Sequence, residues 1–143
     1  MFRSVCILVL MVLCLALPLH AGTTTYGHVR VAEITSVYDG DTFRCNIAGW
    51  PAVAGHNIGV RVFGIDTPEK RGTKGRVKAL ALAARDLTVR TLNRAHSVEL
   101  KNIRRGKYFR LVAEVWVDGR SLADILIRKG LAKPYDGGKK PVW

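Results

Sequence analysis

The segment that decides the fold is Val29–Ile47, with the sequence VRVAEITSVYDGDTFRCNI. Its first half alternates between apolar and polar residues, which is typical of a half-buried strand. Three valines share the apolar face: Val29, Val31 and Val37. Asp39-Gly40 is a dipeptide that favours a tight turn, and the residues after it return to an extended pattern. The segment therefore predicts a β-hairpin.

The rest of the chain adds three strands and two helices to this hairpin. The Gly/Pro/Ala-rich segment 48–57 predicts a loop, and IGVRVFGI at 58–65 predicts a third strand. Apolar residues spaced three and four apart predict an amphipathic helix over 76–94. Strands follow at 96–102 and 108–117, and SLADILIRKG predicts a second helix that Ser121 caps and Gly130 ends. This order predicts a mainly β, α+β domain: a five-stranded Greek-key barrel of the OB type with two helices.

The charge of the chain is strongly positive. Its 143 residues leave room for one domain, and 23 Lys and Arg against 11 Asp and Glu give a formal net charge of +12. Such an excess favours a polyanionic partner, which could be nucleic acid, an anionic membrane surface or an acidic polymer. A solvated basic surface is the alternative, and charge alone does not choose between them.

The N-terminal segment predicts export. Residues 1–21 form a signal-peptide pattern, with Arg3 at the start, an apolar run from Val5 to Leu17, and Pro18 after the run. The run is short for a membrane span, which needs about 20 apolar residues, so an uncleaved anchor is the lesser alternative. Cleavage would leave Cys45 as the single cysteine, without an internal disulfide. We expect a secreted or periplasmic protein of bacterial type, without stable membrane insertion after cleavage.

Three further regions follow the signal peptide. We expect a flexible arm over 22–28, the barrel domain over 29–133, and a basic, extended C-terminal tail over 134–143. We also expect a monomer.

Acidic residues gather at two predicted strand ends. DGDTF carries Asp39 and Asp41, and DTPE carries Asp66 and Glu69. If the third strand pairs with the hairpin, these four carboxylates meet at one rim of the barrel and repel one another unless a cation lies among them. Oxygen ligands without sulfur or clustered imidazole point to calcium or magnesium. The alternative is that both motifs are ordinary turn sequences.

Two arginines add to this pattern. Arg61 lies inside a short apolar strand, where a charge is costly unless the guanidinium reaches the rim and an anion. Arg110 in KYFRLV repeats the arrangement on another strand. A phosphate held between the two guanidinium groups would explain both, although each could instead pair with a rim aspartate.

The motifs YDGDT, RVFGIDTPE, KYFRLVAEVWVDG and ADILIRKGLAK, in this order, resemble the staphylococcal nuclease family from about residue 29 to residue 133. The resemblance implies an OB-fold barrel and a secreted, calcium-dependent phosphodiesterase that acts on DNA and RNA and leaves 3′-phosphate ends. It departs at Phe109, where family members often carry glycine.

The resemblance also implies the residues that bind calcium and activate water. Asp41 and Asp66 would be carboxylate ligands of Ca²⁺, and Thr67 would contribute its backbone carbonyl. Asp39 would act in the second shell or through a water molecule. Glu69 would orient or deprotonate the attacking water.

The remaining roles concern the substrate. The resemblance implies that Arg61 and Arg110 hold the phosphate and stabilise the transition state. Lys107 and Tyr108 would contact a terminal phosphate or a flanking nucleotide, and Tyr135 would stack on a base. We expect a preference for single strands, because a rim groove can take one splayed strand.

Two other function classes remain open at this point. One is an OB-fold module that binds single-stranded nucleic acid without cutting it. The other is an adhesin for anionic surfaces, which leaves the acidic character of Asp39, Asp41, Asp66 and Glu69 unexplained.

Overall fold

The barrel is visible in a computed structural model that describes residues 24–143. The predicted signal peptide lies outside these residues. Five strands make up the barrel: β1 (Val29–Val37), β2 (Thr42–Ile47), β3 (Ile58–Val62), β5 (Val98–Arg105) and β6 (Arg110–Val117). Neighbouring strands pair in the order β3-β2-β1-β5-β6, and β3 also pairs with β6 in parallel, which closes the barrel. The predicted OB-type fold is confirmed.

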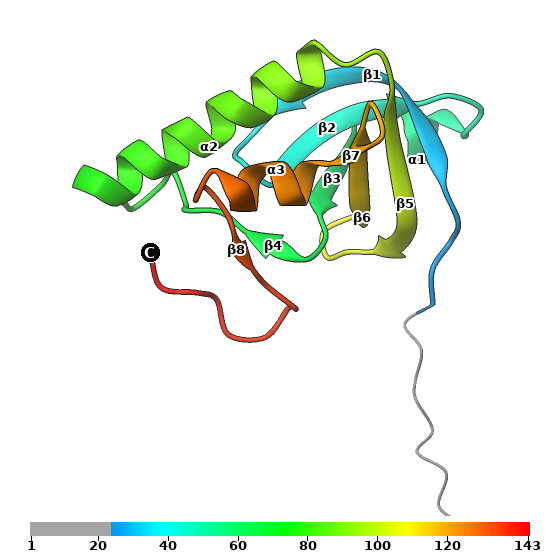
Figure 1. Cartoon of the computed structure of the whole chain (residues 1–143). Coiled ribbons are helices and arrows are strands. Elements are labelled where there is room, and N and C mark those ends of the chain that lie inside the picture. Colours follow the sequence, from blue (N-terminus) through cyan, green and yellow to red (C-terminus); the bar gives the residue numbers. More distant parts are fainter. Residues whose placement is uncertain (1–23) are drawn as a thin grey trace, which may run out of the picture.

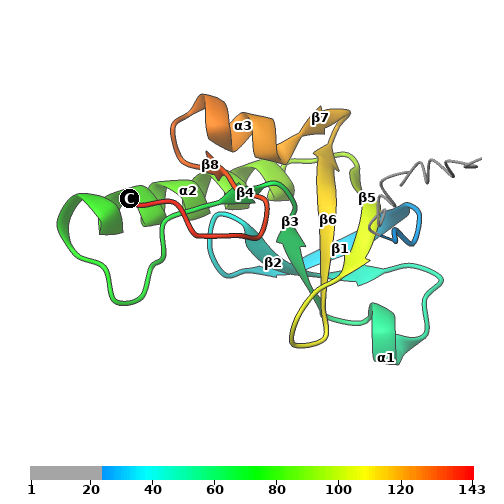
Figure 2. The same cartoon turned by 90° about the horizontal axis from the view of Figure 1, so that it is seen from below.

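Helices and short strands complete the domain. The helices are α1 (Ala52–Gly55), α2 (Gly75–Asn93) and α3 (Leu122–Arg128), and the short strands are β4 (Ile65–Asp66), β7 (Arg120–Ser121) and β8 (Lys133–Pro134). Figures 1 and 2 show α2 and α3 together on one side of the barrel, with α1 on the other side. Within residues 24–143, no helix is both long and apolar enough to cross a bilayer.

The two predicted helices are confirmed, and α1 is an addition to the prediction. The side-chain oxygen of Ser121 accepts a hydrogen bond from the Asp124 backbone N–H, and Gly130 after α3 has a φ of +68°. Helix α1 lies in the segment that predicts a loop. It is a single turn with Pro51 at its N-cap, where φ is −54° and ψ is 140°. A turn this short leaves too little periodicity to be recognised in the sequence.

The start of the last long strand differs from the prediction. Strand β6 begins at Arg110, so Tyr108 and Phe109 belong to the β5–β6 connection. Both have left-handed φ angles, +59° and +53°, which a regular strand does not accept. The connection therefore turns these two aromatic side chains out of the barrel wall.

The core lies inside the barrel and under α3. Its fully buried side chains include Phe43, Val60, Leu100, Leu122 and Leu126. Strand β1 has two register irregularities against β2, so that Ile34 joins the predicted valines on the partly buried face. The ends of β2, β3 and β4 lie at one rim of the barrel, outside this core, and the acidic motifs lie at the same rim.

Candidate active site

Arg61 joins the two acidic motifs at this rim. Thr42 pairs with Arg61 across β2 and β3, which puts Asp41 beside the arginine. Nη1 of Arg61 donates to Oδ1 of Asp41 at 2.8 Å, and Nη2 donates to Oδ1 of Asp66 at 3.1 Å. Both carboxylates are buried. Burial alone would lower the pKa of Arg61, but the charges of Asp41 and Asp66 outweigh it and raise the pKa.

The turn that carries Asp39 and Asp41 is clamped against α2. The hydroxyl of Thr88 donates to the Gly40 carbonyl at 2.8 Å. A Cβ on Gly40 would lie 2.8 Å from the Ala84 Cβ, so only glycine allows this close approach. The barrel and the long helix together therefore fix the position of the acidic turn.

The interior of the acidic turn is closely hydrogen-bonded. Oδ2 of Asp41 accepts from the Thr67 backbone N–H at 3.0 Å, and Oδ1 accepts from the Thr42 hydroxyl at 2.9 Å. Oδ1 of Asp39 accepts from the Asp41 backbone N–H at 3.2 Å. Burial, together with the neighbouring charge of Asp41, raises the pKa of Asp39 from 3.8 to about 7. A second negative charge in this turn, beside that of Asp41, is therefore unfavourable.

The C-terminal tail supplies two contacts to the site. Nζ of Lys140 lies 2.6 Å from Oε1 of Glu69 and 3.6 Å from Oδ1 of Asp66. The indole Nε1 of Trp143 donates to Oδ2 of Asp66 at 3.3 Å. The hydrogen bond to Glu69 raises the pKa of Lys140. Figures 1 and 2 show the tail passing alongside β4 and β8. Sequence reasoning missed Lys140 and Trp143, because the tail has no periodic pattern that would place it.

Arg110 approaches the site from the parallel strand. It pairs with Gly59 across β3 and β6, and a Cβ on Gly59 would lie 3.4 Å from the Arg110 Cγ. The Arg110 side chain therefore runs over Gly59 along the barrel wall. The Nε of Arg110 is buried without a hydrogen-bond partner, and the ion pairs found within residues 24–143 do not include Arg110. Its guanidinium is available for an anion.

One cavity of about 670 Å³ brings most of the predicted residues together, and we call it the carboxylate cavity. Its lining includes Asp39, Arg61, Glu69, Lys107, Arg110 and Tyr135. The Tyr135 backbone N–H donates to the Gly64 carbonyl at 2.9 Å, and the ring lies 5.7 Å from the Arg61 guanidinium carbon.

Tyr108 is the predicted substrate residue that lies outside the carboxylate cavity. Its side chain is 93% exposed and faces a neighbouring groove that also includes Tyr38, Lys70 and Phe109. The left-handed backbone of the β5–β6 connection causes this orientation. A contact between Tyr108 and substrate would therefore require a ligand that extends beyond the carboxylate cavity.

The oxygen atoms at the rim provide only some of the ligands that a hard cation such as calcium needs. Asp41 and Asp66 offer carboxylate oxygens, which calcium prefers. Among residues 24–143, however, no three His, Cys, Asp or Glu side chains come close enough together to hold a metal. Arg61 and the tail already bond to these carboxylates, and Oδ1 of Asp41 accepts from both Arg61 and the Thr42 hydroxyl. The oxygens that accept one bond, such as Oδ2 of Asp41 and Oδ2 of Asp66, keep a second lone pair. A cation would need backbone carbonyls or water to complete its ligands.

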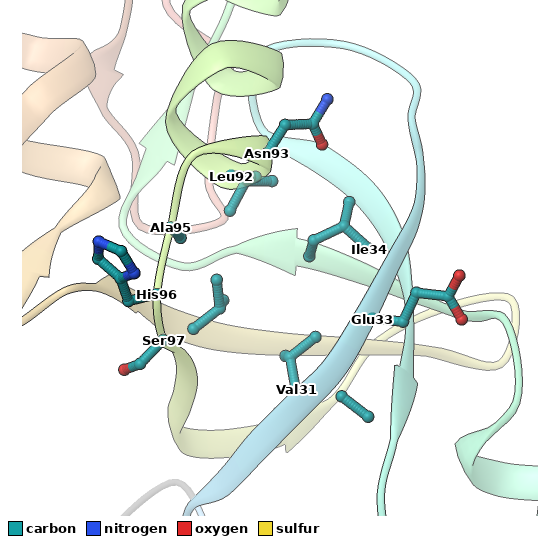
Figure 3. A pocket seen from close by; sticks show the side chains of 10 residues that line it. Val31, Glu33, Ile34, Leu92, Asn93, Ala95, His96 and Ser97 are labelled. Carbon is teal, nitrogen blue, oxygen red and sulfur yellow. The ribbon is translucent and has the colours of Figure 1, made fainter.

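A second cavity, of about 240 Å³, lies between β1 and the end of α2 and shares no residue with the predicted site. Figure 3 shows Val31, Ile34 and Leu92 directed into it, while Glu33 and His96 point away. None of the predicted site residues lies here.

The chain matches a protein-family model. The model described as staphylococcal nuclease homologue matches residues 59–141, which is more than half of the chain. The matched range contains both arginines, Asp66, Thr67 and Glu69. Asp39 and Asp41 precede the matched range. The hydrogen bond from Arg61 to Asp41 joins Asp41 to the matched part of the chain.

Proposed function

Because the chain belongs to the family of staphylococcal nuclease homologues, we propose that it is an exported, calcium-dependent nuclease that hydrolyses phosphodiester bonds of DNA and RNA. The observation that carries the proposal is the carboxylate cavity, where two arginines and Glu69 line one space beside buried carboxylates. Both arginines are suited to a phosphodiester anion, and Glu69 is suited to its hydrolysis.

The arginines would bind and polarise the phosphate. A guanidinium has five N–H donors, and Arg61 uses three bonds to reach Asp41, Asp66 and the Ile65 carbonyl. Its remaining donors, with those of Arg110, can hold the two non-ester oxygens of one phosphate. Charge develops on these oxygens in the transition state, where preorganised donors are most effective.

Glu69 would orient the attacking water and accept its proton. The Glu69 side chain is 54% exposed, so water reaches it easily. In the structure its carboxylate pairs with Lys140, which must give way for Glu69 to act as a base. The basic tail can do so, because Lys140 itself is half exposed.

Asp41, Asp66 and the Thr67 backbone carbonyl would hold the calcium ion, and Asp39 would reach it through a water molecule. The bound ion would neutralise part of the negative charge on the phosphate. Its positive charge would also favour the ionised form of Asp39, whose pKa is raised to about 7 without a metal.

The substrate and cellular context form part of the same proposal. We infer a preference for single strands, 3′-phosphate products, a monomeric enzyme, and a secreted or periplasmic location after removal of residues 1–21. The net charge of +12 supports a polyanionic substrate. The proposed domain spans 29–133, with a flexible arm before it and the basic tail after it.

A non-catalytic binding protein is the second candidate. The specific observation in its favour is the 2.6 Å ion pair between Lys140 and Glu69, which opposes proton transfer to Glu69. Such a protein would bind single strands through the same arginines.

Incubation with denatured DNA and with RNA, in calcium or in a chelator, distinguishes the two candidates. Acid-soluble fragments in calcium alone support the nuclease. A gel shift without fragments supports the binding protein and contradicts the nuclease. An Arg110→Gln variant is the control against contaminating nuclease, because it should lose the cleavage.

A further inference from the structure

An aromatic-lined cavity of about 410 Å³ lies on the far side of Arg110, and the proposed chemistry does not use it. We call it the aromatic cavity. Its lining includes Tyr26, Trp50 and Phe109 together with Arg105 and Arg110. Arg105, Gly106 and Arg110 also line the carboxylate cavity, so the two spaces adjoin at these residues. Figure 2 shows α1 and the β5–β6 connection at the same end of the barrel.

Two of the three aromatic residues have close contacts with neighbouring segments. A Cβ on Gly55 would lie 2.6 Å from the Trp50 Cβ, so α1 packs closely against the base of the Trp50 side chain. The Tyr26 backbone N–H donates to the Ile103 carbonyl at 2.7 Å. The Tyr26 ring lies 5.7 Å from the Arg105 guanidinium carbon, within cation–π distance. These contacts bring the Trp50 and Tyr26 side chains to the cavity.

Phe109 forms the outer wall at a cost to folding. Its side chain is 71% exposed, and its backbone has a φ of +53°. A bulky residue in this left-handed region is strained, and its apolar ring gains little from burial. Positive φ at two adjacent residues is what tight hairpin turns require, so the β5–β6 turn accounts for the backbone angle. It does not account for a bulky, exposed ring at this position, and a ligand that stacks on the ring would.

We propose that the aromatic cavity binds one nucleobase of the strand whose phosphate lies at Arg110. The inference rests on the proposed function and adds a base subsite to it. The walls combine flat aromatic faces with guanidinium groups, as single-strand sites do: arginines follow the backbone and rings stack on bases. The cavity volume of about 410 Å³ lies within the range of small-ligand pockets, roughly 300–1,000 Å³.

Equilibrium binding of a labelled single-stranded oligonucleotide in chelator tests the subsite without requiring cleavage. The oligonucleotide is compared with a set in which each position in turn lacks its base. We expect one position at which base removal weakens binding by roughly 5- to 150-fold, the range for one stacked base. Trp50→Ala should weaken binding of the intact strand similarly and have no further effect on the strand that lacks this base.

Two further variants guard against a folding defect in Trp50→Ala. Tyr26→Ala and Phe109→Gly change exposed side chains, so both should fold. Phe109→Gly also relieves the left-handed strain, and we expect weaker binding with an undiminished melting temperature. Val53→Ala is the matched control, because Val53 is on α1, is 80% exposed and does not line the cavity. It should bind as the unchanged protein does.

The outcomes separate this inference from the proposed function. Base-dependent binding that requires Trp50, without cleavage in calcium, would uphold the subsite and contradict the nuclease. Cleavage in calcium, with binding that is indifferent to Trp50 and Phe109, would overturn the subsite and leave the nuclease in place. A concentration-dependent dimer that Phe109→Gly dissociates would also overturn it, because a second copy of the chain would then occupy the cavity.

Discussion

Replacing Arg61 with glutamine should destabilise the protein as well as inactivate it. Asp41 and Asp66 are 1% and 2% exposed, and Arg61 pairs with both at 2.8 and 3.1 Å. Removing one partner of a buried ion pair costs about 3–5 kcal/mol, because the other charge remains buried. Lys140 stays 3.6 Å from Asp66 and offsets part of this loss. We therefore expect the lower value, about 3 kcal/mol.

Arg110→Gln is the matched control for this prediction. It makes the same change in charge and shape, but the Arg110 Nε has no hydrogen-bond partner and the ion pairs of residues 24–143 do not involve it. Its stability should change by less than about 1 kcal/mol. Both variants should lose about 100- to 1,000-fold in cleavage rate, as the loss of a preorganised donor does.

Urea unfolding in chelator measures the difference between the two variants. The Arg61→Gln midpoint should fall clearly, with an unchanged dependence on urea concentration, while the Arg110→Gln midpoint stays near that of the unchanged protein. Equal stability of the two variants would refute the reasoning, because Arg61 would then not be holding the two buried carboxylates together.

Three further changes probe the rim. Lys140→Ala removes an ammonium that lies 3.6 Å from Oδ1 of Asp66, a proposed calcium ligand, so calcium should bind up to about fivefold more tightly in calorimetry; weaker binding would contradict competition between Lys140 and calcium for Asp66. Native Asp39 stays protonated to about pH 7, against 3.8 when unfolded, so its contribution to stability in chelator falls as the pH rises through this interval. This loss of unfolding free energy is at most about 4 kcal/mol, and Asp39→Asn should remove most of it. If the unfolding free energies of the variant and the unchanged protein depend on pH in the same way, the raised pKa of Asp39 is contradicted. Thr88→Val breaks the bond to Gly40 and should cost about 1 kcal/mol in urea unfolding; no cost would mean that α2 does not clamp the turn.

Local patterns in the sequence account for the parts of the fold that could be predicted. The β1–β2 hairpin follows from the alternation of valines and the Asp39-Gly40 turn. Helix α3 follows from its Ser121 cap and the stop at Gly130, which are signals within a few residues of each other. The meeting of Asp41, Arg61 and Asp66 could be predicted because strand pairing brings adjacent strand ends to one rim.

The parts that could not be predicted depend on contacts between distant segments. Lys140 contacts Glu69, which lies 71 positions earlier in the sequence, and no periodic pattern in the tail indicates this contact. The outward position of Tyr108 depends on backbone angles in the β5–β6 connection, which do not follow from residue type. The aromatic cavity joins Tyr26, Trp50 and Phe109 from three separate segments.

The most direct test of the account compares cleavage and binding in Glu69→Gln. Glu69 is a half-exposed side chain whose proposed task is proton transfer, so its amide should leave the phosphate-binding arginines in place. Single-turnover cleavage of a single-stranded oligonucleotide in calcium should slow by about 100- to 10,000-fold, the contribution of a general base. The dissociation constant for the same strand should stay within about twofold. An unchanged cleavage rate would contradict the account, because phosphodiester hydrolysis would then not occur at this rim.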